Sequence, residues 1–127
     1  KDVEMKAIVH VSIDKYKQSI KFEVDIDSLP DIKFDGYEVI AKWHVENFEN
    51  NQTFYTDANG LEMQKRILNY RPTWDIQENY NDSNENITAN FYPIQQAISM
   101  KTVDEKRIFT VTNDRSQSGS ALEEGSI

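Results

Sequence analysis

The sequence predicts an all-β chain folded as an antiparallel β-sandwich, and three observations support this class. Apolar and polar residues alternate over several short segments, which is typical of strands that bury one face. Turn-forming residues separate these segments, and no helical apolar stripe of useful length occurs among them. Aromatic residues make up 11% of the 127 residues, so the chain carries large side chains with which to fill a core.

The N-terminal segment predicts a hairpin. Apolar and polar residues alternate from residue 3 to residue 13, and a second alternation covers residues 20–26. A turn over residues 14–17 lies between them. Because a connection this short favours antiparallel neighbours, the two strands are expected to pair with each other.

The central segment predicts a third strand and a second hairpin. A loop over residues 27–36 precedes a strand over residues 39–45. A short aromatic strand at 54–56 and a return arm over 61–67 flank the turn at 57–60. This turn contains an Asn-Gly pair, which favours the positive φ angles of a tight hairpin.

The C-terminal half predicts a loop and two further strands. Five asparagines and no apolar period mark an irregular loop at about residues 75–90. Strands are expected over residues 94–100 and 107–112, followed by a polar tail rich in small residues over 116–127. Together the elements predict a single β-sandwich domain over residues 1–127.

Composition excludes several classes of protein. The absence of Cys excludes disulfide scaffolds, thiolate zinc sites and cysteine nucleophiles. The four scattered glycines form no phosphate-binding loop. A net charge of −8 argues against a nucleic-acid partner, which would require clustered Lys and Arg. No apolar run approaches the ~20 residues that a membrane helix needs, so no membrane span is expected.

Paired acidic residues and two histidines are candidates for chemistry. Asp25 and Asp27 share a strand face at a spacing that a glycosidase can use, but a solvated strand edge is the simpler interpretation. His10 and His44 both fall on polar strand faces and can bind a metal together with a carboxylate. Two exposed histidines are favoured instead, because no third ligand is fixed. No G-x-S-x-G sequence indicates a nucleophilic serine.

The two tryptophans have different surroundings. Trp43 follows the apolar alternation of its strand and is predicted to lie in the core. Trp74 lies in an irregular segment, where it can either pack against the sandwich or stack on a sugar ring, and packing is favoured.

Three N-x-[ST] sequons indicate possible glycosylation at Asn51, Asn81 and Asn86. All three fall in segments predicted to be loops, where a glycan can be attached. These sequons favour a protein of the secretory pathway.

Four motifs, in order along the chain, resemble one family. They are F-Y-T-D-A-N-G at 54–60, Y-R-P-T-W at 70–74, N-F-Y-P at 90–93 and D-R-S-Q-S-G-S-A-L at 114–122. This series is similar to glycoside hydrolase family 38, the class II α-mannosidases, and its second motif resembles the lysosomal branch. The departures are small and lie at Ser118, Ala121, Asn69 and Asn113.

The resemblance implies a parent enzyme that is a large, zinc-dependent, retaining α-mannosidase acting on the α-mannosides of glycoprotein glycans. In this family the zinc ligands and the nucleophile lie in an N-terminal catalytic domain, and none of the four motifs carries them. The chain is therefore expected to be an excised, non-catalytic β-domain with no cofactor of its own. Its expected partners are the catalytic and helical domains of the same polypeptide, in a lysosomal or secretory compartment.

The resemblance also suggests where this domain approaches substrate. The last motif makes Asp114, Arg115 and Ser116 the candidates for residues near the mannoside. An alternative function is a carbohydrate-binding module, in which exposed aromatic residues such as Trp74 or Tyr80 stack on sugar rings.

Overall fold

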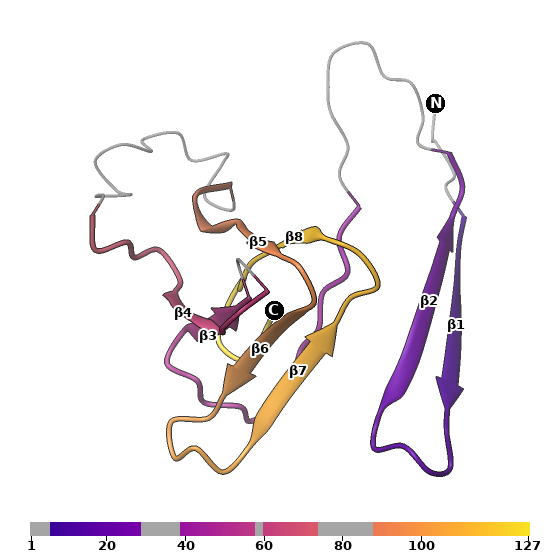
Figure 1. The fold of residues 1–127 in the computed structure, drawn as a ribbon, viewed down its shortest axis with the longest axis horizontal. Helices are drawn as coiled ribbons and strands as arrows, with labels where there is room; N and C mark the ends of the chain where they lie inside the picture. Colours follow the sequence, from indigo (N-terminus) through magenta and orange to yellow (C-terminus); the bar gives the residue numbers. More distant parts are fainter. Residues whose placement is uncertain (1–5, 29–38, 58–59, 74–87) are drawn as a thin grey trace. The chain divides into compact units, whose positions relative to one another are not determined.

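The computed structural model describes residues 6–28, 39–57, 60–73 and 88–127 (Figure 1). These residues form strands that pair antiparallel throughout, together with one short 3₁₀ helix, so the predicted all-β antiparallel class is confirmed. The chain divides into two compact units, Lys1–Ile40 and Ala41–Ile127. A single domain over residues 1–127 stays a prediction. Within the described ranges, no helix has the length and apolar character needed to span a membrane.

The first unit contains the predicted hairpin. Strand β1 (Ala7–Ile13) pairs antiparallel with β2 (Ile20–Ile26) along their full lengths. The connecting turn is closed by Asp14, whose side chain accepts a hydrogen bond from the N–H of Tyr16 at 2.9 Å. Asp is favoured at such positions because its carboxylate replaces a backbone acceptor.

The register of this hairpin separates apolar from polar residues. Val9 lies opposite Val24 and Val11 lies opposite Phe22, so one face is entirely apolar. On the other face all residues except Ile8 are polar, and Lys21 forms an ion pair with Glu23 at 2.8 Å. We define the apolar hairpin face by its eight residues: Ala7, Val9, Val11, Ile13, Ile20, Phe22, Val24 and Ile26.

The second unit contains a four-stranded antiparallel sheet in the order β4-β3-β6-β7. Its strands are β3 (Thr53–Thr56), β4 (Gln64–Ile67), β6 (Ala97–Lys101) and β7 (Ile108–Thr112). The predicted strand at 107–112 is confirmed, and the predicted return arm is shortened to β4. Alternating burial along β3 and β7 follows from side chains that point to opposite faces of a sheet.

A second, two-stranded sheet packs near the first. It is formed by β5 (Tyr92–Ile94) and β8 (Gln117–Gly119), and the 3₁₀ helix η1 (Thr88–Asn90) precedes it. A Cβ added at Gly119 would lie 3.0 Å from the Cδ1 of Ile98 on β6, so the two sheets approach closely there. This arrangement of two packed sheets is sandwich-like.

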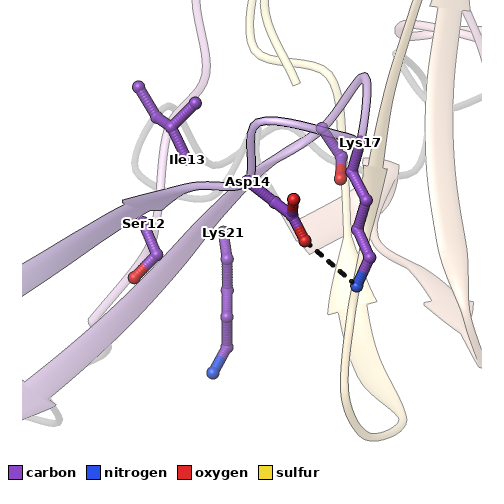
Figure 2. Close-up of a pocket in the computed structure, with 6 residues that line it drawn as sticks. Ser12, Ile13, Asp14, Lys17 and Lys21 are labelled. Carbon is purple, nitrogen blue, oxygen red and sulfur yellow. Dashed lines mark ion pairs between the residues drawn. The ribbon is translucent and has the colours of Figure 1, made fainter.

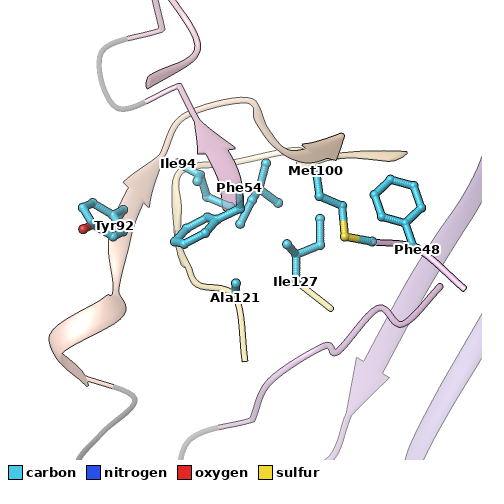
Figure 3. Close-up of a cluster of buried hydrophobic side chains, with 8 residues drawn as sticks. Phe48, Phe54, Tyr92, Ile94, Met100, Ala121 and Ile127 are labelled. Atoms are coloured by element: carbon cyan, nitrogen blue, oxygen red, sulfur yellow. The ribbon is translucent and has the colours of Figure 1, made fainter. Parts of the chain in front are cut away.

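The core of the second unit lies between these sheets (Figure 3). Phe54 and Met100 are fully buried, and the Phe54 ring meets the Tyr92 ring edge-on with a centroid distance of 5.8 Å. Trp43 packs against the same cluster while remaining partly exposed, as its alternation predicts. The buried hydrophobic cluster comprises Phe48, Phe54, Tyr92, Ile94, Ile98, Met100, Ala121 and Ile127.

Three sequence predictions are corrected by the structure. The strand expected over residues 39–45 is reduced to one isolated bridge between His44 and Ser126. Its partner is the C-terminal segment, where Trp43 and Ile127 exchange backbone hydrogen bonds of 2.8 and 3.0 Å. The backbone pairing continues only to Val45, whose N–H donates to the carbonyl oxygen of Gly125 at 2.9 Å, and Asn47 beyond it has a φ of 54°, outside the range of strand residues.

The second correction concerns the strand expected over 94–100, which is two strands, β5 and β6, separated by a turn at Gln95 and Gln96. The third concerns the end of the expected loop at 75–90, where residues 88–90 form η1. The remainder of that loop lies outside the described residues. The C-terminal tail, expected to be merely polar, contains β8 and the buried side chain of Ile127.

Candidate functional site

Two of the family-like motifs meet at the turn between β5 and β6. Asp57 of the first motif is only 6% exposed, and its carboxylate accepts the N–H groups of Gln95 at 2.8 Å and Gln96 at 2.7 Å. Burial alone raises the pKa of Asp57, but the backbone donors of Gln95, Gln96 and Ala97 outweigh it and lower the pKa below its ordinary value. Asp57 therefore stabilises this turn as a carboxylate.

The loop between β7 and β8 is fixed to the same turn. The N–H of Asn113 donates to the carbonyl oxygen of Gln96 at 2.8 Å. The hydroxyl of Ser116 donates to the side-chain oxygen of Gln95 at 2.7 Å. Residues 95 and 96 thus connect Asp57 to the loop that carries the predicted substrate-proximal residues.

Asp114 and Arg115, at the tip of this loop, bind each other. The guanidinium donates to both carboxylate oxygens, and the shortest contact joins Nη2 to Oδ2 at 2.8 Å. Hydrogen bonding to Asp114 raises the pKa of Arg115, so the guanidinium stays charged. The two side chains are 71% and 76% exposed, respectively, and they offer hydrogen-bonding groups that can meet the hydroxyls of a sugar.

The second and third motifs also meet, at η1 and β5. Asn69 and Asn90 form two hydrogen bonds with each other. The backbone N–H of Asn69 donates to Oδ1 of Asn90 at 2.7 Å, and Nδ2 of Asn90 donates to Oδ1 of Asn69 at 2.8 Å. Arg71 donates to the carbonyl oxygen of Ala89 at 2.8 Å. The positive φ of Asn69, 58°, suits Asn better than most residues.

Tyr92 is held between two arginines. The guanidinium carbon of Arg66 lies 4.2 Å from the centre of the Tyr92 ring, and that of Arg71 lies 4.6 Å from it. Such stacking is favourable because a guanidinium is attracted to the electron-rich face of an aromatic ring. Sequence reasoning missed these contacts, because they join residues that are more than 20 positions apart in the sequence.

A third cluster ties the C-terminal segment to the turn before β3. One oxygen of Glu124 accepts the N–H groups of Asn50 at 2.5 Å and Asn51 at 2.8 Å, and the other accepts that of Gln52 at 3.0 Å. Consecutive N–H groups that converge in this way form an anion-binding nest. Gly125 has a φ of 69°, and a Cβ there would lie 2.9 Å from a backbone oxygen of Val45.

The other candidates from the sequence lie apart from these clusters. His10 of the first unit faces Asp25 at 3.5 Å, whereas His44 of the second unit bonds the hydroxyl of Ser126 at 2.8 Å. Each histidine therefore has its own partner. Within the described parts of the chain, no three His, Cys, Asp or Glu side chains lie together as a metal site would require.

Asp27 and the acidic residue Glu123 are also accounted for by structural contacts. Glu123 forms an ion pair with Lys42 at 2.5 Å, and hydrogen bonding to Lys42 lowers the pKa of Glu123. Asp27 continues the hairpin pairing, because its N–H donates to the carbonyl oxygen of Lys6 at 3.1 Å.

A pocket of about 270 Å³ lies at the hairpin turn of the first unit (Figure 2). Asp14 and Lys17, which form an ion pair at 3.8 Å, contribute to its lining. The full lining is Ser12, Ile13, Asp14, Lys17, Ser19 and Lys21. None of the four motifs contributes a residue to this pocket, so it is not assigned to them.

Comparison with known proteins decides the family. The sequence model described as the glycosyl hydrolases family 38 C-terminal domain matches residues 2–127. The chain belongs to this family. The clusters around Asp57, Tyr92 and Glu124 are therefore features of a family 38 C-terminal domain.

The similar proteins described here are all named as alpha-mannosidases. Lysosomal alpha-mannosidase of Bos taurus is 38% identical over 92 residues, which are 72% of this chain and 8% of that protein. Lysosomal alpha-mannosidase of Homo sapiens is 33% identical over 111 residues, 87% of this chain and 10% of that protein. A probable alpha-mannosidase of Arabidopsis thaliana is 33% identical over 113 residues, 89% of this chain and 10% of that protein. This family 38 chain thus spans about a tenth of the length of these relatives.

Several predicted site residues stay predictions. Asp114, Arg115 and Ser116 lie together on one loop, and their place near substrate stays a prediction. Asn51 is exposed at the turn before β3. Asn81 and Asn86 lie outside the described residues, as do Trp74 and Tyr80 of the alternative carbohydrate-binding function.

Proposed function

We propose that this chain is a non-catalytic β-domain of a zinc-dependent retaining α-mannosidase, which hydrolyses the α-mannosides of glycoprotein glycans in the lysosome or secretory pathway. Its role is to support the catalytic domain and to shape the edge of its cleft. Membership of the family 38 C-terminal domain and the names of its relatives support this proposal.

The observation that carries the supporting role is the apolar hairpin face. Every residue of β1 and β2 is exposed, including Val11 at 55% and Phe22 at 40%. A contiguous exposed apolar face of this kind marks an interaction surface. Relatives of the chain are about ten times longer than it. We therefore propose that the remainder of the same polypeptide covers the apolar hairpin face.

Zinc belongs, on this proposal, to the catalytic domain of the parent enzyme. The described residues do not fit a zinc site, since no group of three suitable ligands lies together among them. The carboxylates of Asp57, in the first motif, and Glu124, just after the last motif, instead hold the domain's own turns at 95–96 and 50–52.

The contribution to the cleft is assigned to the loop tip at Asp114 and Arg115. This loop is anchored through Asn113 and Ser116 to a turn that Asp57 stabilises. A loop fixed in this way can present Arg115 at a defined position without an entropic penalty on each binding event. Arg115 is therefore proposed as the residue that meets mannose hydroxyls.

The supporting role is tested in the full-length enzyme by placing a charge on either face of the hairpin. Val11→Lys puts an ammonium on the apolar hairpin face, and the matched control Ser12→Lys puts it one residue away on the polar face. We expect Val11→Lys to destabilise the enzyme by about 2–3 kcal/mol, because it buries an unpaired charge, and Ser12→Lys to have little effect. Equal melting temperatures for the two variants would contradict the proposal.

The non-catalytic assignment has its own test. Residues 1–127 alone, supplied with zinc and an aryl α-mannoside, should show no turnover. Turnover that persists through purification, and that a chelator abolishes, would show that the chain carries a catalytic centre.

A further inference from the structure

The turn before β3 contains two neighbouring asparagines with opposite surroundings. Asn50 is 2% exposed; its amide nitrogen donates to the carbonyl oxygen of Thr53 at 2.8 Å, and its amide oxygen accepts the N–H of Gly125 at 3.0 Å. Asn51 is exposed, and its hydrogen bonds are made by its backbone alone. The fold therefore uses the side chain of Asn50 and leaves that of Asn51 in solvent.

The conformation of this turn does not depend on the Asn51 side chain. Glu124 accepts the N–H groups of Asn51 at 2.8 Å and of Gln52 at 3.0 Å, and these bonds hold the backbone. Asn51 has a φ of 49° and Gln52 one of 53°, so neighbouring residues of different type adopt the same left-handed conformation. A bulky group on the Asn51 amide would meet solvent and would displace no hydrogen bond of the side chain.

Asn51 also begins the sequon Asn51-Gln52-Thr53. Thr53 supplies its hydroxyl, which donates to the carbonyl oxygen of Asn51 at 3.2 Å in the folded turn. We propose that Asn51 carries an N-linked glycan in the mature protein, an inference that rests on the secretory location in the proposed function. A glycan is a surface modification of secreted proteins, and this position satisfies both the sequence and the exposure that it requires.

The modification is a glycosyl transfer from a lipid diphosphate-linked oligosaccharide. A bond forms between Nδ2 of Asn51 and the anomeric carbon of the first sugar, while the bond from that carbon to the diphosphate oxygen breaks. The lipid diphosphate leaves with the electron pair of the broken bond, and Nδ2 loses one proton. No residue of this chain performs the step, so the chain is the acceptor substrate of a membrane-bound transferase.

The test uses the full-length enzyme secreted from eukaryotic cells. Peptides are mapped by mass spectrometry after enzymatic release of N-glycans in ¹⁸O-labelled water, which converts an occupied Asn to a labelled Asp. We expect the label at position 51 in the wild type and in Thr53→Ser, which keeps the sequon and the hydroxyl. We expect its loss in Asn51→Gln and in Thr53→Val, which remove the acceptor and the sequon, respectively.

Unlabelled Asn51 in folded, secreted wild-type enzyme would overturn the inference. Hydrolysis of an aryl α-mannoside by the same preparation separates this failure from a failure of the proposed function. An active enzyme without the label contradicts the glycan alone, whereas a labelled protein without activity contradicts the proposed enzyme. If Thr53→Val fails to be secreted, Asn51→Gln replaces it, because this variant keeps the backbone N–H groups that Glu124 accepts.

Discussion

The hairpin of β1 and β2 differs from the sheets of the second unit in where its apolar side chains lie. In β3 and β6 the apolar residues face a core in which Phe54 and Met100 are fully buried. In the hairpin the alternation is at least as regular, yet every residue is exposed. Regular alternation therefore predicts a strand in both places. Burial also needs a second layer: the second unit contains two packed sheets, whereas the described part of the first unit, taken by itself, contains one hairpin.

The two regions also differ in what stabilises them. The second unit is stabilised by its own core and by three clusters that join distant segments, at Asp57, Tyr92 and Glu124. A two-stranded hairpin without a covering layer is marginally stable in water. Substitutions should therefore have large effects in the second unit and small effects in the hairpin when the chain is studied alone.

The largest effect is expected from the centre of the core. Phe54→Ala removes a fully buried ring that meets Tyr92 and should lower the free energy of unfolding by about 3–5 kcal/mol. Phe22→Ala on the apolar hairpin face is the matched control and should lower it by less than about 1 kcal/mol in the isolated chain. Urea denaturation monitored by Trp fluorescence measures the free energy of unfolding of both variants. Similar decreases in the two variants would contradict the difference between the two regions.

A smaller effect is expected at Gly125. Gly125→Ala introduces a Cβ at a φ of 69°, 2.9 Å from a backbone oxygen, and should cost about 2–3 kcal/mol through strain and crowding. Gly60→Ala is the control, because its φ of 65° is similar but its nearest neighbour is 4.0 Å away. Gly60→Ala should cost only about 1 kcal/mol. Equal melting temperatures for the two variants would contradict the close packing of residue 125 against the backbone of Val45.

Asp57 makes stability dependent on pH. Its pKa is lowered in the folded protein, so its contribution is complete above the unfolded pKa and is lost as the pH falls through the folded pKa. Asp57→Asn should cost about 1–3 kcal/mol at neutral pH and should flatten the decline of the melting temperature in acid. An unchanged acid decline in Asp57→Asn would show that other carboxylates, such as Asp104, dominate it.

The smallest effect on stability is expected at Arg115. Its ion pair with Asp114 is exposed on both sides, so Arg115→Gln should leave the free energy of unfolding almost unchanged. In the full-length enzyme the same variant should raise KM for a mannoside several-fold. An unchanged KM would remove Arg115 from the proposed cleft edge while leaving the fold of the domain as described.

Much of the fold could be predicted from local pattern, but the clusters that hold it could not. The hairpin register follows from alternation and a short turn, as in the pairing of Val11 with Phe22. The turn at 95–96 was missed because its cause, Asp57, lies 38 residues away in the sequence from Gln95. The burial of Ile127 was missed because its partner, Trp43, belongs to a segment that looked like an ordinary strand.

The four motifs could be recognised, but their physical role could not be read from the sequence. Composition alone does not show that Asn69 and Asn90 bond each other or that two arginines stack on Tyr92. Each contact joins residues that are at least 21 positions apart in the sequence. Long-range pairing of this kind is fixed by the tertiary fold and leaves no local periodicity.

The most direct test of the proposed role compares hydrogen exchange of the β1–β2 amides in residues 1–127 alone and in the full-length enzyme. If the remainder of the polypeptide covers the apolar hairpin face, these amides should exchange markedly more slowly in the full-length enzyme, because local opening then exposes buried apolar surface. The β3 and β6 amides, protected by their own core, serve as the internal reference. Equal exchange of the hairpin amides in the two proteins would contradict the assignment of this face to the parent enzyme.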